Sequence, residues 1–181
     1  MSPKTFLFLL QMPAMFSKEP FGLAAFVASP LSAQQAPDAV SAGTVDGKEY
    51  MKEADKKAIE RIIQSYLAGW RKLDAQILAE IWDKTYDRLS YWPAELDQPI
   101  TGWKGIEQYY EEATNALEIK EFRASDPVID VFGDVAYASP KTFFSAVTKE
   151  TGEKTEAEGR VSFILRKESG KWLVTNYLEP H

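Results

Sequence analysis

The apolar residues of this 181-residue chain change their spacing once, close to Leu117, and this change constrains the fold most strongly. Before it, three segments repeat apolar residues at intervals of three and four, as amphipathic helices do. After it, four segments rich in Val, Ile, Phe and Tyr alternate with polar residues. Helices grouped before a meander predict an α+β domain rather than a parallel sheet.

Three helices and a short strand pair are expected in the first part. The first helix, over residues 50–73, carries an apolar stripe made of Ile59, Ile62, Ile63, Tyr66, Leu67 and Trp70. Asp74 can cap a second helix that ends near residues 83–84. A short strand over residues 88–92 ends at Pro93, and residues 97–102 return the chain to a third helix that begins at Trp103.

Four long antiparallel strands are expected in the second part, over residues 118–132, 135–148, 155–167 and 171–178. Turn residues separate them at 133–134, 151–152 and 169–170. In the third strand one face carries Ala157, Val161, Phe163 and Leu165, and the other carries Glu156, Glu158, Arg160 and Ser162.

Composition excludes several kinds of site. The sequence has no cysteine and one histidine, His181, so a thiolate nucleophile and a metal site built on thiolates or several imidazoles are excluded. The formal net charge of −6 disfavours binding to nucleic acid or to an anionic membrane surface. We expect neither a metal nor a cofactor.

The N-terminal 45 residues differ from the rest in composition and resemble a secretory signal. Lys18 precedes the apolar run at residues 21–28, and small residues follow up to Ala33, the best cleavage position. Neither apolar run there reaches the roughly 18–20 residues that span a bilayer. We predict a signal peptide at 1–33, a flexible leader at 34–49 and one domain at 50–181, in a periplasmic or secreted protein. The alternative is a disordered tail on a cytoplasmic protein.

The order of these elements resembles the SnoaL-like and ketosteroid-isomerase-like families of the nuclear-transport-factor-2-like superfamily. The resemblance rests on Trp82 at the end of the second helix, Gly102-Trp103 at the start of the third, and the C-terminal run from Arg160 through Trp172. It implies a cone: three N-terminal helices against a strongly curved antiparallel sheet, made of a four-stranded meander and a short strand pair. Relatives are often homodimers through the outer face of the sheet, and they include isomerases, cyclases, dehydratases, hydrolases and non-catalytic proteins.

The sequence departs from these families at the residues that perform chemistry. Ketosteroid-isomerase-like members use an aspartate base on the first short strand and a tyrosine of the first helix as an oxyanion donor. Tyr66 matches that tyrosine, but the strand offers Ser90, with Asp87 three residues away. The His-x-His-x-Ser tail of many relatives is replaced by Asn176, Leu178 and Pro180.

The resemblance and the aromatic content together give the candidate site residues. Catalytic roles would fall to Tyr66 as oxyanion donor and Asp87 as base, with Asp83 as the alternative base. Arg160 either anchors a ligand or belongs to a salt-bridge ladder on its strand. The expected ligand-binding residues are Tyr66, Trp82, Tyr86, Tyr91, Trp103, Tyr110, Arg160 and Asn176.

Three functions stay open at this point. The leading one is an exported pocket protein that binds a small apolar or aromatic, possibly acidic, molecule. The second is a cofactor-independent isomerase, cyclase or dehydratase that acts on a carbonyl substrate. The third is a non-catalytic dimerisation or assembly module whose rings only fill the core.

Overall fold

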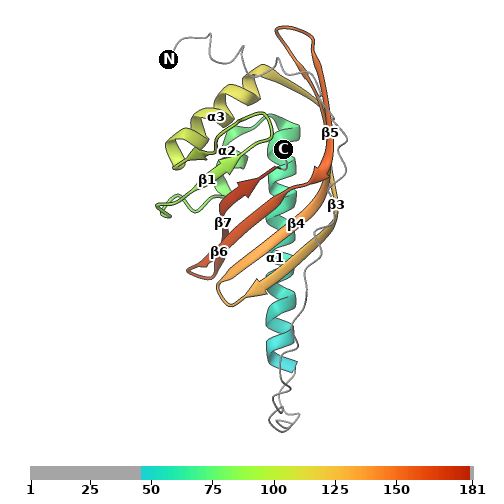
Figure 1. Cartoon of the computed structure of the whole chain (residues 1–181). Coiled ribbons are helices and arrows are strands. Elements are labelled where there is room, and N and C mark those ends of the chain that lie inside the picture. Colours follow the sequence, from blue (N-terminus) through green and yellow to red (C-terminus); the bar gives the residue numbers. More distant parts are fainter. Residues whose placement is uncertain (1–45, 180–181) are drawn as a thin grey trace, which may run out of the picture. The chain divides into compact units, whose positions relative to one another are not determined.

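Three helices and seven strands make up residues 46–179, which are the residues that this computed structural model describes. The predicted signal peptide and residues 34–45 of the predicted leader lie outside the described residues, as do Pro180 and His181. Figure 1 shows α1 lying along one face of the curved sheet. No described helix is long and apolar enough to span a bilayer.

Helix α1 (Asp46–Lys72) begins four residues before the predicted start and buries five of the six predicted stripe residues, while Ile62 is half-buried. Ile59, Ile63 and Tyr66 on this stripe are buried. Gly69 lies on the same helix where α2 packs closely, since a Cβ there would come within 2.7 Å of the Leu78 side chain.

The second helix, α2 (Ala75–Glu80), is capped as predicted. The Asp74 side chain accepts hydrogen bonds from the backbone N–H groups of Gln76 (2.9 Å) and Ile77 (3.2 Å). The helix ends before the predicted position because Trp82 already pairs with Val174 of the sheet through a parallel bridge.

A two-strand hairpin, β1 (Ser90–Trp92) and β2 (Ile100–Thr101), precedes helix α3 (Trp103–Ala116). Strand β1 is two residues shorter at its start than the expected strand. Gly102 joins β2 to α3 with a φ of 75°, a conformation that favours glycine.

The sheet is completed by β3 (Leu117–Phe132), β4 (Val135–Thr148), β5 (Lys154–Arg160), β6 (Ser162–Glu168) and β7 (Lys171–Leu178). Its strand order is β2-β1-β7-β6-β4-β3, and β5 pairs with β4.

Two details of the predicted sheet were wrong. The expected strand 155–167 is divided at Val161, whose N–H bonds to Pro140 O (3.3 Å). Its two halves pair with different parts of β4, and Pro140, which has no N–H to donate, lies between those parts. The sheet is also mixed, because β1 pairs with β7 in parallel. A parallel pair needs a long connection between its two strands. Here β2, α3 and the strands β3 to β6 connect β1 to β7.

The two faces of the sheet differ in burial. We call the face that packs against α1 the inner face and the opposite one the outer face. Along β4, Ala136 and Ala138 are buried on the inner face, while Val135 and Tyr137 are exposed on the outer face.

Candidate functional site

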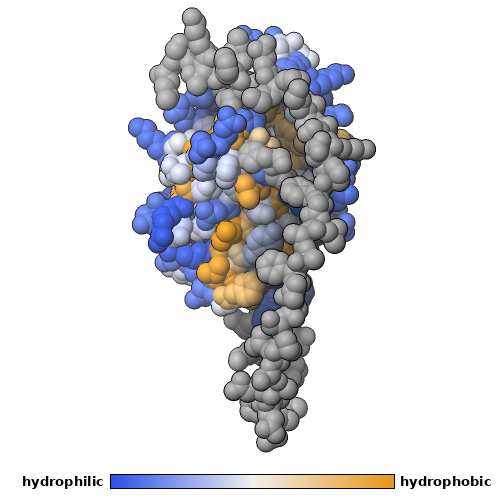
Figure 2. All heavy atoms as spheres, viewed as in Figure 1, coloured by the Kyte–Doolittle hydropathy of each residue, from blue (hydrophilic) through white to orange (hydrophobic). Residues whose placement is uncertain are grey.

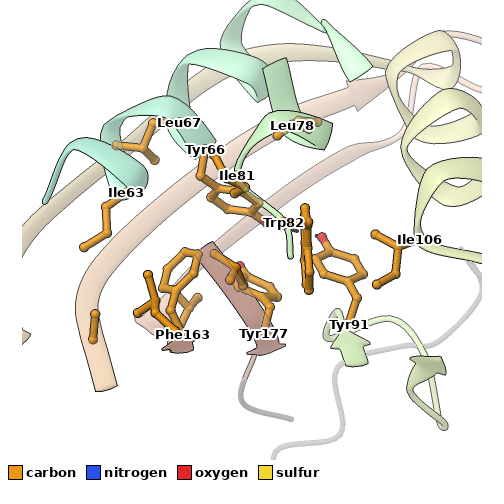
Figure 3. Packing of buried hydrophobic residues seen from close by; sticks show 14 of the residues in the cluster. Ile63, Tyr66, Leu67, Leu78, Ile81, Trp82, Tyr91, Ile106, Phe163 and Tyr177 are labelled. Carbon is orange, nitrogen blue, oxygen red and sulfur yellow. Dashed lines mark hydrogen bonds between the residues drawn. The ribbon is translucent and has the colours of Figure 1, made fainter. Parts of the chain in front are cut away.

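Five tyrosines meet on the inner face of the sheet, and we call them the tyrosine cluster: Tyr66, Tyr91, Tyr109, Tyr110 and Tyr177. The rings of Tyr91 and Tyr177 stack with centroids 5.0 Å and planes 16° apart, because the parallel pairing of β1 with β7 sets these residues side by side. Figure 3 shows Tyr66 on α1 pointing toward Phe163 and Tyr177 of the sheet.

Hydrogen bonds link the polar atoms of this aromatic region. The hydroxyls of Tyr66 and Tyr91 lie 3.2 Å apart and share a hydrogen bond. Trp82 Nε1 donates to the hydroxyl of Tyr110 at 3.1 Å. Two further bonds lead to carboxylates: Tyr177 donates to Glu179 at 2.6 Å, and Tyr109 donates to Glu95.

Burial raises the pKa of every phenol in the tyrosine cluster, because it disfavours the phenolate form. The negative charge of Glu179 raises each of these pKa values further. At neutral pH all five side chains are therefore neutral O–H groups that can donate or accept a hydrogen bond.

The loop at residues 93–99 lies beside the tyrosine cluster and is fastened to β7 and α3. Ala94 N–H donates to Glu179 Oε2 (3.1 Å), and Glu179 N–H donates to Trp92 O (2.9 Å). Glu95, on the same loop, accepts the bond from Tyr109 of α3. Glu179 is bonded to Ala94, the residue that precedes Glu95. The two carboxylates therefore reach the tyrosine cluster at the same part of this loop.

The inner face is covered unevenly along the strand that continues from β5 into β6. On β6, Phe163 and Leu165 are buried, whereas on β5 Ala157 is exposed. Ala157 pairs with Phe144, so both side chains lie on the inner face, and Phe144 packs on Phe122 with centroids 5.3 Å apart. We call this uncovered region the open inner face; its residues are Phe144, Thr155, Ala157 and Gly159.

The open inner face adjoins the tyrosine cluster. The ring of Phe122 lies between the two, because its centroid is 5.3 Å from that of Phe144 and 5.9 Å from that of Tyr66. A molecule resting on Ala157 and Phe144 would therefore be one ring away from a phenol.

The sequence profile of the SnoaL-like domain matches residues 59–178. The chain belongs to the SnoaL-like family. No curated protein matches the sequence.

Solved structures with the same fold include relatives of this SnoaL-like chain in several bacteria. A nuclear transport factor 2-like superfamily protein from Salmonella enterica is 22% identical over 72% of this chain and 94% of that one, with a TM-score of 0.58. A ketosteroid isomerase-like protein from Erwinia carotovora is 20% identical over 68% and 96%, with a TM-score of 0.55. A protein from Planctomyces limnophilus is 22% identical over 70% and 95%, with a TM-score of 0.60. At these identities the likeness establishes the fold.

Four of the predicted ligand-binding residues of the SnoaL-like domain come together in the interior. Tyr66, Trp82, Tyr91 and Tyr110 are each at most 3% exposed and pack against one another. These four side chains are part of the buried core, whereas the exposed residues of the candidate site lie on the open inner face.

Two other predicted ligand-binding residues pack at the edge of the core, and each contacts a cation of the chain. Tyr86 is half-buried beneath the guanidinium of Arg166, 5.2 Å from its ring centroid. Trp103 is half-buried beneath Lys84 Nζ at 4.3 Å.

The predicted base Asp87 is exposed and 3.9 Å from Arg88, outside the tyrosine cluster. The alternative base, Asp83, is only 1% exposed and accepts two hydrogen bonds from Arg166, at 2.6 and 2.9 Å. Burial opposes ionisation of Asp83, but bonds from Thr85 and Arg166 outweigh it and hold the pKa of the carboxyl below its usual value. A carboxylate bonded in this way is a poor proton acceptor.

Arg160 and Asn176 lie on the outer face. Arg160 Nη1 donates to the carbonyl oxygens of Ser139 (2.8 Å) and Asp126 (3.1 Å). Asn176 pairs with Ile164, an outer-face residue, so it points away from its neighbour Tyr177. The structure brings neither residue into contact with the tyrosine cluster.

Four residues of the site were not among the predicted ones: Tyr109, Tyr177, Glu95 and Glu179. Tyr109 does belong to the apolar stripe of α3, and the spacing of two between Tyr177 and Glu179 places them on one face. These signals were present in the sequence. No pattern marked Glu95, which lies in a loop.

Away from the open inner face, an open depression lies at the junction of α1 and α2, against the end of α3, and its lining is mainly polar. It is lined by Lys72, Leu73, Asp74, Ala75, Gln76, Glu111, Thr114 and Asn115. The described residues contain no group of three or more His, Cys, Asp or Glu that could hold a metal ion.

Proposed function

We propose that this SnoaL-like protein binds a small apolar or aromatic molecule on the open inner face, next to the tyrosine cluster and without a cofactor. The observation that carries the proposal is that Ala157 is exposed on the inner face of β5. Phe163, on the same face of β6, which continues from β5, is buried. Uncovered small residues beside a half-buried ring provide room and apolar surface for a ligand.

The hydroxyls of the tyrosine cluster support this proposal. Phenylalanine would fill almost the same volume, and a buried hydroxyl without a compensating bond costs roughly 1–3 kcal/mol. Each of the five hydroxyls has a hydrogen-bond partner within the chain, and as neutral O–H groups they could also meet a polar atom of a ligand that reaches them.

A second function, cofactor-independent isomerisation or dehydration of a carbonyl compound, is favoured by one observation. The Glu179 carboxylate lies 2.6 Å from the hydroxyl of Tyr177, next to Tyr66. To take the proton from the carbon beside a carbonyl group, Glu179 would have to release a hydrogen bond from Tyr177 or from the N–H of Ala94, while a phenol donates to the enolate oxygen that forms. In this version Glu179 takes the role that sequence reasoning gave to Asp87.

Binding on the open inner face can be tested with a blocking variant and a matched control. Ala157→Trp would fill the open inner face, whereas Glu158→Trp places the same ring on the outer face of the same strand. Fragments that raise the melting temperature of the wild type should lose this effect in Ala157→Trp and keep it in Glu158→Trp. Equal effects in both variants, or no stabilising fragment at all, would favour a non-catalytic assembly module instead.

The outer face supports a homodimer as the working form. All six large apolar side chains that are exposed among the described residues share this face: Val128, Phe132, Val135, Tyr137, Ile164 and Leu178. Figure 2 shows apolar residues gathered on the viewed face of the sheet. Contiguous exposed apolar surface is typical of protein interfaces.

The dimer can be tested by light scattering coupled to size-exclusion chromatography. Ile164→Lys should yield the mass of one chain, whereas wild type and Gln64→Lys, a change on the exposed side of α1, should yield the mass of two. A monomeric wild type would contradict this part of the proposal.

Export is proposed from the sequence of residues 1–33. The expected mature chain begins at Gln34 and is found outside the cytoplasm. N-terminal sequencing of the protein from fractionated cells of its host tests this; an intact Met1 in the cytoplasmic fraction would contradict it.

A further inference from the structure

We infer that Arg160 is a positioning residue: from the outer face of the sheet it fixes the strand that carries most of the open inner face. This inference rests on the proposed function and adds a residue that the site needs although the ligand does not touch it. It differs from both roles that the sequence suggested for Arg160, a ligand anchor and a member of a salt-bridge ladder.

Three neighbouring strands are interrupted along one line across the sheet. In β3, Asp126 and Pro127 lie opposite the single residue Pro140 of β4, which makes a bulge, and Asp126 has a φ of 46°. Pro140 has no N–H to donate, and next to it β5 and β6 meet at Val161. A bulge bends its strand, and a missing N–H leaves a gap in the ladder of hydrogen bonds. The sheet can therefore bend along this line, which we call the bend line.

Arg160 ties the strands together at the bend line through main-chain oxygens. It is the last residue of β5, and its Nη1 donates to the carbonyl oxygen of Ser139 on β4 at 2.8 Å. The same nitrogen donates to the carbonyl oxygen of Asp126 in the β3 bulge at 3.1 Å. Bonds from a charged donor are stronger than bonds between neutral groups. One side chain thus joins β5 to both β4 and β3 where their own ladder is interrupted.

A salt bridge does not explain the placement of Arg160. The residue directly opposite it on β4 is Lys141, which carries a like charge. None of the ion pairs within residues 46–179 includes Arg160, whereas Lys141 binds Glu158 at 2.8 Å. The guanidinium of Arg160 therefore serves the main chain rather than a carboxylate.

The shape of the open inner face depends on what holds β5. Among the described strands β5 pairs only with β4, yet it carries every residue of the open inner face except Phe144. Figure 1 shows β5 continuing beyond β6 and β7. The β3 side is fixed separately, because Arg71 of α1 donates to the main-chain oxygen of Phe122 at 2.6 Å. Without Arg160, β5 would move more freely, and a smaller fraction of the molecules would be ready to bind a ligand.

Hydrogen exchange on the full chain tests whether Arg160 holds β5. Arg160→Met keeps the aliphatic stem and removes both main-chain bonds. The matched control, Lys141→Met, also removes one exposed cation of the outer face beside the bend line, but one that bonds to a carboxylate. Amide exchange in Arg160→Met should become faster over residues 154–160 and stay unchanged in β7, and Lys141→Met should change neither. Arg160→Lys, which can still donate to a carbonyl, should recover part of the protection.

Binding of neutral fragments to the same variants tests whether this hold matters for the site. The probes are indole, 2-naphthol and 2-phenylethanol, with dissociation constants from ligand-observed NMR. Probes that bind to the wild type and not to Ala157→Trp should bind several-fold more weakly to Arg160→Met and unchanged to Lys141→Met. All variants should keep the wild-type mass in light scattering, and a loss of affinity that accompanies a change in mass would contradict the inference.

The outcomes separate this inference from the proposed function. Faster exchange over the whole domain of Arg160→Met would indicate a general loss of stability and would overturn the inference. Unchanged exchange or unchanged affinity in Arg160→Met, or equal effects in Lys141→Met, would also overturn it. In each of these cases the proposed function stands if Ala157→Trp still abolishes binding. If no probe binds to the wild type, both fail.

Discussion

The hydroxyls of Tyr66 and Tyr91 lie 3.2 Å apart in the protein interior, although the two residues are 25 positions apart in the chain. This bond joins α1 to β1. Each of Tyr66→Phe and Tyr91→Phe should lower the free energy of unfolding by about 1 kcal/mol, the usual value for a lost hydrogen bond. The double variant should lose less than the sum, because the second change removes a hydroxyl that has already lost its partner. Urea denaturation measures this; additive losses would show that the two hydroxyls are not coupled.

The ion pair between the buried Asp83 and the half-buried Arg166 should contribute to the loss of stability in acid. Asp83→Asn is expected to lower the free energy of unfolding at pH 7 by about 1–3 kcal/mol, because it removes the charge that binds Arg166 while water screens the exposed part of that pair. The pKa of Asp83 is lowered in the folded state, so its contribution is present above the ordinary carboxyl pKa of about 4 and is lost as the pH falls through the lower folded value. Stability of the wild type should therefore fall more steeply below pH 4 than that of Asp83→Asn. Parallel pH profiles would contradict this.

The tyrosine cluster should resist alkaline titration. Because burial raises their pKa, these five phenols stabilise the fold below the ordinary phenol pKa of about 10 and oppose folding as the pH rises above it. Hydrogen bonds from Ser139 and Ser162 lower the pKa of Tyr137 instead. Phenolate absorbance should therefore appear in two stages: an early stage that includes Tyr137, and a later stage from the tyrosine cluster together with cooperative unfolding. A single smooth titration near pH 10 would contradict the buried network.

Gly69→Ala should destabilise the protein although alanine is the better helix former. Helix propensity alone would predict a gain of up to about 1 kcal/mol. A Cβ at this position would lie 2.7 Å from Cγ and Cδ2 of Leu78, so we expect a net loss of about 1–3 kcal/mol in the free energy of unfolding. Adding Leu78→Ala should cost less in the Gly69→Ala background than in the wild type. A stabilised Gly69→Ala protein would mean that α1 and α2 pack less closely.

The secondary structure and much of the core could be predicted because they follow from local periodicity. The stripe of α1 follows from apolar residues at spacings of three and four, and the opposite faces of Arg160 and Phe163 follow from the alternation of a strand. The cap at Asp74 follows from the residue type that precedes a helix. Each of these signals depends on neighbours within a few positions.

The site could be predicted only in part, because a single extra residue reverses the faces of a strand. Leu165 pairs with Val174 and Ile164 pairs with Asn176, so Thr175 is an extra residue in β7. Simple alternation from Trp172 would place Asn176 on the inner face. The bulge places Tyr177 and Glu179 there instead.

The remaining differences come from contacts between distant segments. The parallel pairing of β1 with β7 and the meeting of Glu95 with Tyr109 depend on how the chain returns after α3 and the meander. Asp87 lies near the expected base position in sequence, but the strand begins only at Ser90 and leaves it exposed. Spacing along a loop does not fix where its side chains point.

Native mass spectrometry of the protein purified gently from its own host tests the central claim most directly. Wild type and Glu158→Trp should each carry a discrete small-molecule mass above that of the chain, and Ala157→Trp, with its open inner face filled, should not. A bare chain mass for all three, under conditions that preserve other non-covalent complexes, would contradict a ligand site on the open inner face.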